Sequence, residues 1–249
     1  DVERSRGLGD VYKRQEYTYR KKAKGENDMK KRNVIAMLCA LCVLTLLLPM
    51  QTNAASAKKN KKAMTAYHQF LSQDQIQWSE WTSIPSSDVL FAAADINKDG
   101  VKELIVRYVQ ASHMDGWHRI YTYKKGRVKS LGHFTNVYIY KNKNFFVDSY
   151  ANTGVIQNSY YRLGKNGKKI TLAKYQISDT PASAKGKTVK KYNADMGYDV
   201  YYSDMKVNGK KVSYKKCMKK IRSLEKRAKQ LNLKFYENTA ENTVRYLVK

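Results

Sequence analysis

Short runs of β-branched and aromatic residues, divided by turn residues, fill the chain after Pro85 and constrain its fold more than any other feature. The clearest pair is Val155 to Leu163 and Ile170 to Ile177, joined through Lys165-Asn166-Gly167-Lys168. Asn-Gly between two strand-like runs is a strong hairpin signal, because both residues tolerate the positive φ that a tight primed turn needs. The sequence therefore predicts antiparallel strands that follow one another as a meander.

The same reasoning predicts the other strands. They are Val89 to Ala94, Leu104 to Val109, Arg119 to Tyr123, Val128 to Phe134, Val137 to Tyr140, Phe145 to Tyr150 and Val200 to Val207. Ser178 to Lys191 is polar and rich in small residues, which favours a long loop. In the tail, Leu233 to Tyr236 and Thr243 to Val248 are expected as edge strands. The predicted fold class is mainly β with flanking helices (α+β).

Two segments have helical rather than alternating spacing. A short N-terminal helix is expected around Ala63, Tyr67 and Leu71, after a basic, unstructured leader at Lys58 to Lys62. A longer amphipathic helix is expected from Ser213, as N-cap, to about Leu231. Its apolar stripe consists of Tyr214, Cys217, Met218, Ile221, Leu224, Ala228 and Leu231. The stripe favours packing on the protein's own sheet, and the lysine-rich opposite face leaves a membrane surface as the alternative.

The first 57 residues are not expected to belong to the folded domain. Ser5 to Gln15 resembles a translated sequencing adapter, so residues 1–28 are interpreted as a leader that is non-native or untranslated. Residues 29–57 are interpreted as a signal peptide, because Lys30-Lys31-Arg32 precedes an uncharged run from Asn33 to Met50 and a small-residue cleavage region.

Cleavage is expected after Ala54 or Ala57, which leaves residues 58–249 as a single domain. The alternative is an uncleaved membrane anchor, since the uncharged run approaches the roughly 18 residues that span a bilayer. The expected location is secreted or extracellular, with the cell surface as a second location. Membrane contact is expected only through the signal segment. Only Cys217 follows this segment, so the domain has no intrachain disulfide.

The chain is strongly basic, with 48 Lys and Arg against 21 Asp and Glu and a formal net charge of +27. An exported protein of this charge attracts anionic wall polymers and acidic glycans through a field that does not depend on sequence. The alternative is that the lysines are simply solubilising surface. Nucleic acid is not the expected partner, because the sequence holds no recognition motif and export separates it from the genome.

One loop carries side chains suited to a metal ion. Calcium prefers about six to eight oxygen ligands, and a tight loop supplies them from alternate positions. The expected ligands stand at positions one, three, five, seven and nine of the loop, and are Asp95, Asn97, Asp99, Val101 through its carbonyl, and Glu103. Gly100 at position six permits the sharp reversal.

This loop resembles the Asp-x-Asn/Asp-x-Asp-Gly calcium loops of EF-hands, dockerins and FG-GAP repeats. It departs from the EF-hand in having Val106 where a bidentate Glu is expected, and in having strands rather than helices on both sides. The likeness is therefore closer to the strand-loop-strand FG-GAP form. The wider strings around Phe91 to Val106 and Phe235 to Ala240 resemble uncharacterised secreted proteins of Gram-positive gut bacteria, which imply no activity. The structural alternative is a hairpin turn at Lys98-Asp99-Gly100 that holds no metal.

No catalytic residue is expected. His113, Asp115 and His118 form a weak transition-metal candidate, and Cys217 lies on the apolar stripe as an inert thiol. The predicted function is a non-catalytic calcium-binding domain with a structural ion and a basic surface for anionic wall polymers or glycans. The alternative is a secreted hydrolase or inhibitor, whose site would gather His113, His118 or His133 with a carboxylate in a pocket.

Overall fold

The computed structural model describes residues 54–112, 116–164 and 167–248. Contacts group Ser56–Lys249 into one compact unit. The predicted leader at 1–28 lies outside the described residues, as does the signal segment up to residue 53. No helix in the described part of the chain is long and apolar enough to cross a membrane, and the uncharged run Asn33 to Met50 lies outside that part.

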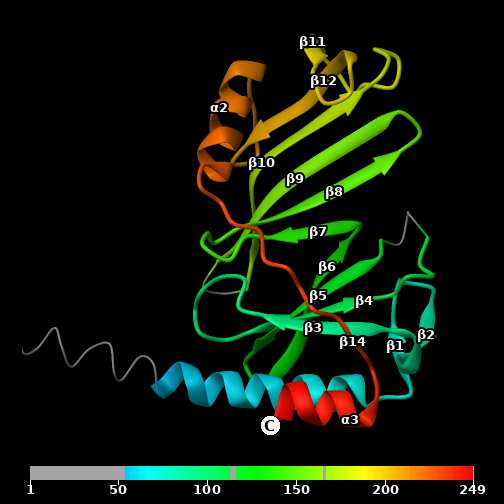
Figure 1. Cartoon of the computed structure of the whole chain (residues 1–249), viewed down its shortest axis with the longest axis vertical. Helices are drawn as coiled ribbons and strands as arrows, with labels where there is room; N and C mark the ends of the chain where they lie inside the picture. The colour runs from blue at the N-terminus through cyan, green and yellow to red at the C-terminus, as the bar shows by residue number, and fades with distance from the viewer. Residues whose placement is uncertain (1–53, 113–115, 165–166, 249) are drawn as a thin grey trace, which may run out of the picture. The chain divides into compact units, whose positions relative to one another are not determined.

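The first main sheet has five antiparallel strands in the order β14-β3-β4-β5-β6 (Figure 1). Its strands are β3 (Leu90–Ala94), β4 (Glu103–Arg107), β5 (His118–Lys124), β6 (Arg127–Phe134) and β14 (Tyr236–Glu237). A separate hairpin of β1 (Gln75–Gln77) and β2 (Ser83–Pro85) precedes it, followed by the 3-10 turn η1 (Ser86–Asp88). The chain's tail returns to this sheet, because Tyr236 pairs with Phe91.

The second main sheet has seven antiparallel strands in the order β11-β12-β10-β9-β8-β7, with β13 paired to β12. Its strands are β7 (Asn136–Ile139), β8 (Phe146–Asn152), β9 (Val155–Leu163), β10 (Lys169–Ser178), β11 (Val189–Asn193), β12 (Tyr198–Val207) and β13 (Lys210–Lys211). From β7 to β10 each strand pairs with the next along the chain. Then β12 pairs with β10, and β11 lies at the outer edge.

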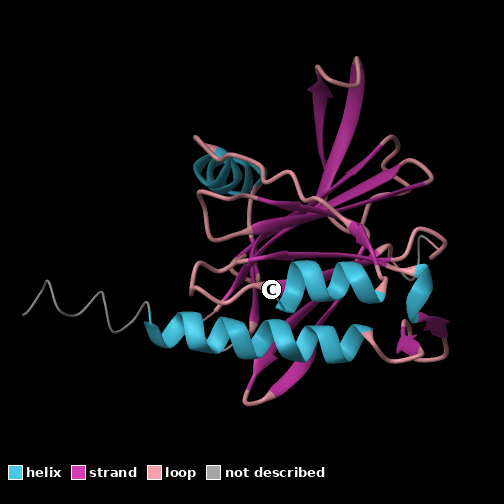
Figure 2. Cartoon of the chain, turned by 60° about the horizontal axis from the view of Figure 1, so that its bottom comes forward, coloured by secondary structure: helices cyan, strands magenta, loops and turns pink. Residues whose placement is uncertain are grey.

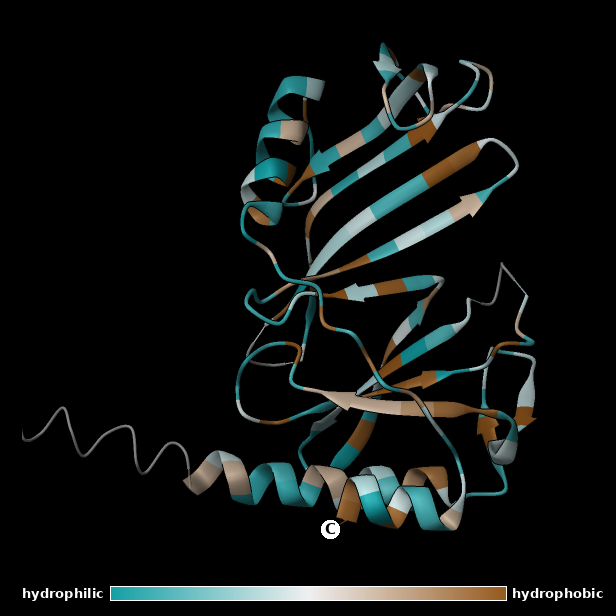
Figure 3. Cartoon of the chain, viewed as in Figure 1, coloured by the Kyte–Doolittle hydropathy of each residue, from teal (hydrophilic) through white to brown (hydrophobic). Residues whose placement is uncertain are grey.

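Helices cover the outer faces of the two sheets. A helix at residues 54–71 lies beside α3 (Ala240–Thr243) and its π-helical continuation η2 (Val244–Val248), as both views show (Figures 1 and 2). The helix α2 (Tyr214–Glu225) lies against the seven-stranded sheet. Most of its residues are hydrophilic (Figure 3), and its buried residues are Cys217 and Ile221.

The core consists of three apolar clusters that lie between these layers. Ala63 and Tyr67 from the N-terminal helix pack with Leu104 and Val106 on one face of the five-stranded sheet. Ile105 faces the other way, into a cluster shared with β8 and β9 of the second sheet. Because β4 is buried on both faces, its sequence is a continuous apolar run rather than an alternating one. A third cluster lies between α2 and the seven-stranded sheet.

The predicted fold class is confirmed, since the chain is mainly antiparallel β with a helix towards each end. Three local predictions were wrong. Residues 58–62 are helical rather than an unstructured leader. The second helix begins after Ser213 as expected but ends at Glu225, not near Leu231, because Arg227 has φ of 57° and turns the chain away. The expected loop at Ser178 to Lys191 gives way to β11 at Val189.

The tail is the largest departure from the sequence prediction. Thr243 to Val248 is helical, not an edge strand. The side chain of Thr239 accepts a hydrogen bond from the backbone N–H of Asn242 and so caps the start of α3. Leu247 is buried in the cluster under the N-terminal helix, so the tail helix is held by packing and not by pairing with a strand.

Candidate metal centre

The predicted metal loop connects β3 to β4, and the pairing of Ala94 with Glu103 closes it. The chain reverses at two positions with positive φ, Lys98 at 60° and Gly100 at 82°. Glycine is suited to the second position, because it adopts this conformation without steric cost. The strand-loop-strand context expected from the sequence is therefore present, and the segment 95–103 is called the 95–103 loop below.

The side chains of the first three predicted ligands are joined by hydrogen bonds within one turn. The N–H of Asp99 donates to Asp95 Oδ1 at 3.2 Å and to Asn97 Oδ1 at 3.0 Å. The N–H of Gly100 donates to Asp95 Oδ2 at 2.9 Å, and the amide of Asn97 donates to Asp99 Oδ2 at 3.2 Å. These side chains thus point into the same turn and not away from one another.

Glu103 lies at the base of the loop and is only 1% exposed. Its carboxylate accepts hydrogen bonds from the N–H of Ile96 at 3.0 Å and from the hydroxyl of Thr122 at 3.4 Å. Burial raises the pKa of Glu103 to about 8, and the nearby charges of Asp99 and Asp95 act in the same direction. Within the described residues no Lys or Arg forms an ion pair with Glu103. A cation in the loop would remove this electrostatic cost.

Val101, predicted as a ligand at position seven, is 3% exposed, and its N–H donates to Asp99 Oδ1 at 2.9 Å. No group of three or more His, Cys, Asp or Glu side chains in the described residues is already gathered closely enough to hold a metal. Binding would therefore require the oxygens to draw closer. The donor chemistry fits calcium, because the set consists of oxygens alone and each carboxylate oxygen keeps a second lone pair beside its hydrogen bond.

Three residues from two distant segments of the chain hold the loop in place. From the N-terminal helix, Asn60 Oδ1 accepts a hydrogen bond from the N–H of Lys102 at 2.9 Å. Tyr67, on the same helix, donates to the carbonyl of Lys102 at 3.0 Å. Between β7 and β8, the amide of Asn144 donates to the carbonyl of Asn97 at 2.9 Å. No local pattern connects Asn60, Tyr67 or Asn144 with this loop, because each reaches the loop only through the tertiary fold.

Of the predicted histidines, the described residues include His118 and His133, and these two do not line the same hollow. His118 is buried, its Nδ1 lies 2.8 Å from the carbonyl oxygen of Thr135, and burial lowers its pKa. His133 lies instead on a hollow of about 490 Å³, whose lining includes Glu80 and Arg119. His113 and Asp115 lie outside the described residues.

Cys217, which the sequence analysis interpreted as inert, is fully buried in α2. Burial raises the pKa of its thiol to about 11. Because the thiolate is the nucleophilic form, this cysteine is a poor nucleophile near neutral pH.

Comparison with known proteins identifies no relative, since no protein family, curated protein or solved structure matches the chain.

Proposed function

We propose that the chain is a secreted or cell-surface domain, without catalytic activity of its own, in which the 95–103 loop binds one structural calcium ion. The observation that carries this proposal is that oxygens of Asp95, Asn97 and Asp99 accept hydrogen bonds within one turn, at whose base the carboxyl group of Glu103 is buried. The charges of Asp95 and Asp99 disfavour ionisation of Glu103, and a divalent cation in the loop would offset that effect.

The expected affinity is modest. Val106 occupies the position where an EF-hand has its bidentate Glu, and its side chain is fully buried in the core. Without that ligand, we expect a dissociation constant in the range of roughly 0.1 to 1 mM, as in extracellular calcium modules. At ten times this constant, the ion would stabilise the fold by about 1.4 kcal/mol. The ion's role is thus to support the β3–β4 turn and its contacts with the N-terminal helix.

The second part of the proposal concerns the basic surface. The formal net charge of +27 suits an anionic wall polymer or glycan outside the cell. The outer face of α2 adds exposed lysines, among them Lys215, Lys216 and Lys219. Retention of the protein on purified cell walls should fall as salt is added, because added ions screen these charges.

The calcium site is tested by thermal unfolding with and without millimolar calcium. We expect the melting temperature of the native chain to rise with calcium and that of Asp99→Asn to stay constant. Asp74→Asn is the matched control, since Asp74 is exposed and lies outside the loop. If the native chain shows no rise in calcium, the site is refuted.

A secreted hydrolase or inhibitor is the second candidate, favoured by the hollow that contains both His133 and Glu80. Phe70, Trp78 and Tyr121 add aromatic surface to this hollow. If the chain is a hydrolase, His133→Ala should abolish turnover of its substrate. The rise in melting temperature with calcium should be the same as in the native chain. An inhibitor would instead lose affinity for its target enzyme.

A further inference from the structure

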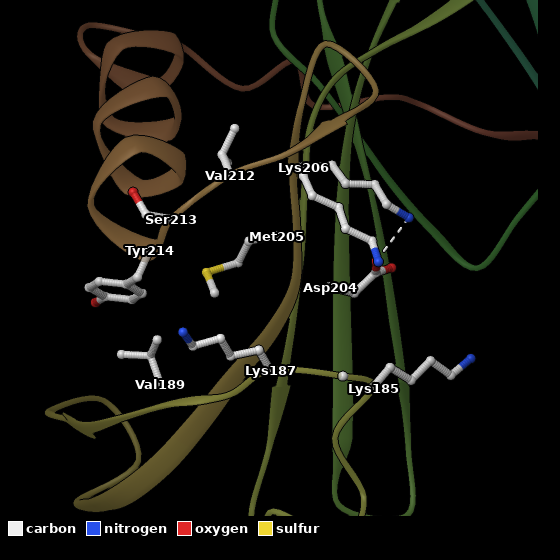
Figure 4. Close-up of a pocket in the computed structure, with 11 residues that line it drawn as sticks. Lys185, Lys187, Val189, Asp204, Met205, Lys206, Val212, Ser213 and Tyr214 are labelled. Atoms are coloured by element: carbon white, nitrogen blue, oxygen red, sulfur yellow. Dashed lines mark ion pairs between the residues drawn. The ribbon is translucent and has the colours of Figure 1, made fainter.

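A second cavity, of about 880 Å³, lies between the 179–188 loop, β12, β13 and the start of α2 (Figure 4). Its apolar wall consists of Val189, Met205, Val212 and the ring of Tyr214. Lysines surround this wall, namely Lys185, Lys187, Lys206 and Lys211. The combination fits a ligand with a carbon backbone and negative charges.

The charge of this cavity is not balanced by the protein. Asp204 is the one acid among the lining residues, and Lys206 at 2.8 Å and Lys174 at 3.1 Å already neutralise it. No acid in the described part of the chain forms an ion pair with Lys185, Lys187 or Lys211. Three ammonium groups around one cavity thus remain available for an external anion.

The start of α2 adds to the same positive field. Ser213 occupies the N-cap position, yet its hydroxyl makes no capping hydrogen bond, and the first turn of the helix holds no acid. A helix N-terminus carries a partial positive charge and N–H groups without partners, so it attracts anions. Both Ser213 and Tyr214 line the cavity.

The lysine-bearing loop is held in position before any ligand arrives. The N–H of Lys185 donates to the hydroxyl of Ser203 on β12 at 3.3 Å. The amide of Gln176 on β10 donates to the carbonyl of Ser183 at 3.0 Å. Gly186 has φ of 79° between the two lysines, and Lys185 and Lys187 leave the loop on opposite sides (Figure 4). The ammonium group of Lys187 lies towards the apolar wall, and that of Lys185 lies on the other side of the loop, so the two do not meet at one point (Figure 4).

We propose that this cavity binds a phosphodiester segment of a polyol-phosphate polymer, with the phosphates at the lysines and the polyol carbons on the apolar wall. The inference rests on the second part of the proposed function and names the place where the basic surface holds its polymer. Lysine acts as a point charge towards phosphate and needs no fixed bidentate geometry. Spread lysines match successive phosphates of a chain better than a single small anion.

Fluorescence anisotropy of a labelled glycerol-phosphate oligomer tests the inference on the full chain. The cavity variant is Lys187→Gln with Lys211→Gln. The matched control is Lys219→Gln, on α2, with Lys226→Gln, directly after the end of α2, and both control positions are exposed. Both variants remove the same charge.

We expect the cavity variant to bind at least about tenfold more weakly and the control to change by about twofold or less. The salt dependence of binding should also become shallower in the cavity variant alone. The replaced lysines are exposed or on the loop surface, and circular dichroism checks that both variants fold.

Each of the other outcomes of this experiment would refute a stated part of the proposal. Equal weakening in both variants refutes the cavity and leaves a diffuse basic surface. Absence of oligomer binding by the native chain refutes the cavity and the polymer partner together, whereas the calcium test above is unaffected. The same binding is also measured with inorganic phosphate and with phosphatidylglycerol vesicles. If vesicle binding alone depends on Lys187 and Lys211, the phosphate comes from a lipid headgroup and the polymer proposal is wrong.

Discussion

The hydroxyl of Tyr67 donates a 3.0 Å hydrogen bond to the backbone carbonyl of Lys102, 35 positions further along the chain. Tyr67 is fully buried on the helix at residues 54–71, and Lys102 belongs to the 95–103 loop. The same helix accepts a hydrogen bond from the N–H of Lys102 through Asn60. The helix therefore bonds both backbone polar groups of Lys102, its N–H and its carbonyl, so a change in the loop should affect the helix.

The substitution Tyr67→Phe tests this connection. It keeps the ring in the core but leaves the Lys102 carbonyl without this donor, so we expect a loss of about 1 to 2 kcal/mol in the free energy of unfolding. Calcium should also stabilise the variant less than the native chain. Urea denaturation with and without calcium measures both effects. Tyr138→Phe, at an exposed tyrosine on β7, is the control and should leave stability unchanged.

Gly100 is expected to tolerate no side chain, for two separable reasons. Its φ of 82° disfavours residues with a Cβ, and in the full chain, or in a chain cleaved after Ala54, an added Cβ would overlap the hydroxyl of Ser56. Gly100→Ala should therefore destabilise the protein by more than about 1 kcal/mol and weaken calcium binding.

Gly126→Ala provides the matched control for this substitution. Gly126 has φ of 80°, but an added Cβ there would meet nothing within 4 Å. The loss in Gly126→Ala thus measures backbone strain alone, and the excess in Gly100→Ala measures the clash with Ser56. Equal losses in the two variants would show that the contact with Ser56 does not restrict the loop.

Local signals allowed the strands and the candidate loop to be predicted. The run Val155 to Leu163 corresponds to β9 with the same bounds. Its residues favour a strand, and the turn that follows favours a hairpin, so both local signals agree. The oxygen-bearing residues of the 95–103 loop were identified for the same reason, since their spacing is local. The gathering of their side chains follows from the turn itself.

Features that depend on distant contacts could not be predicted in the same way. The apolar residues of Thr243 to Val248 fit a strand or a short helix equally well, and only the burial of Leu247 against the N-terminal helix decides between them. The burial of Glu103 follows from packing around β4, and its neighbour Thr122 comes from another strand. The lysine-lined cavity combines segments from 185 to 214, and a count of lysines alone does not place them around one space.

Glu103 should make stability depend on pH when calcium is absent. Burial raises its pKa to about 8 from an ordinary value of 4.5, so the folded state keeps a proton that the unfolded state has released. This contribution to stability is full below pH 4.5 and is lost as pH rises through 8. The melting temperature of the native chain should therefore fall between pH 4.5 and pH 8. That of Glu103→Gln should fall less, because its side chain cannot ionise.

Thermal unfolding in a calcium chelator from pH 5 to 9 measures this difference. Glu237→Gln, at an exposed acid on β14, should follow the native chain. Calcium should reverse the trend, because the ion favours the ionised carboxylate and its affinity then rises with pH. Parallel pH profiles for the native chain and Glu103→Gln would contradict the raised pKa.

The last prediction concerns Cys217, the buried thiol of α2. Its pKa of about 11 leaves very little thiolate at pH 8, and its side chain is fully buried in the cluster between α2 and the seven-stranded sheet. We expect iodoacetamide to label it at least about a hundredfold more slowly in the folded protein than in urea. Mass spectrometry of the peptide that contains Cys217 follows the reaction.

Ser223→Cys places a second thiol at an exposed position of the same helix and should react at once. Comparable rates at the two positions would mean that α2 does not stay packed on the sheet, and the lysine cavity beside its first turn would lose one of its walls.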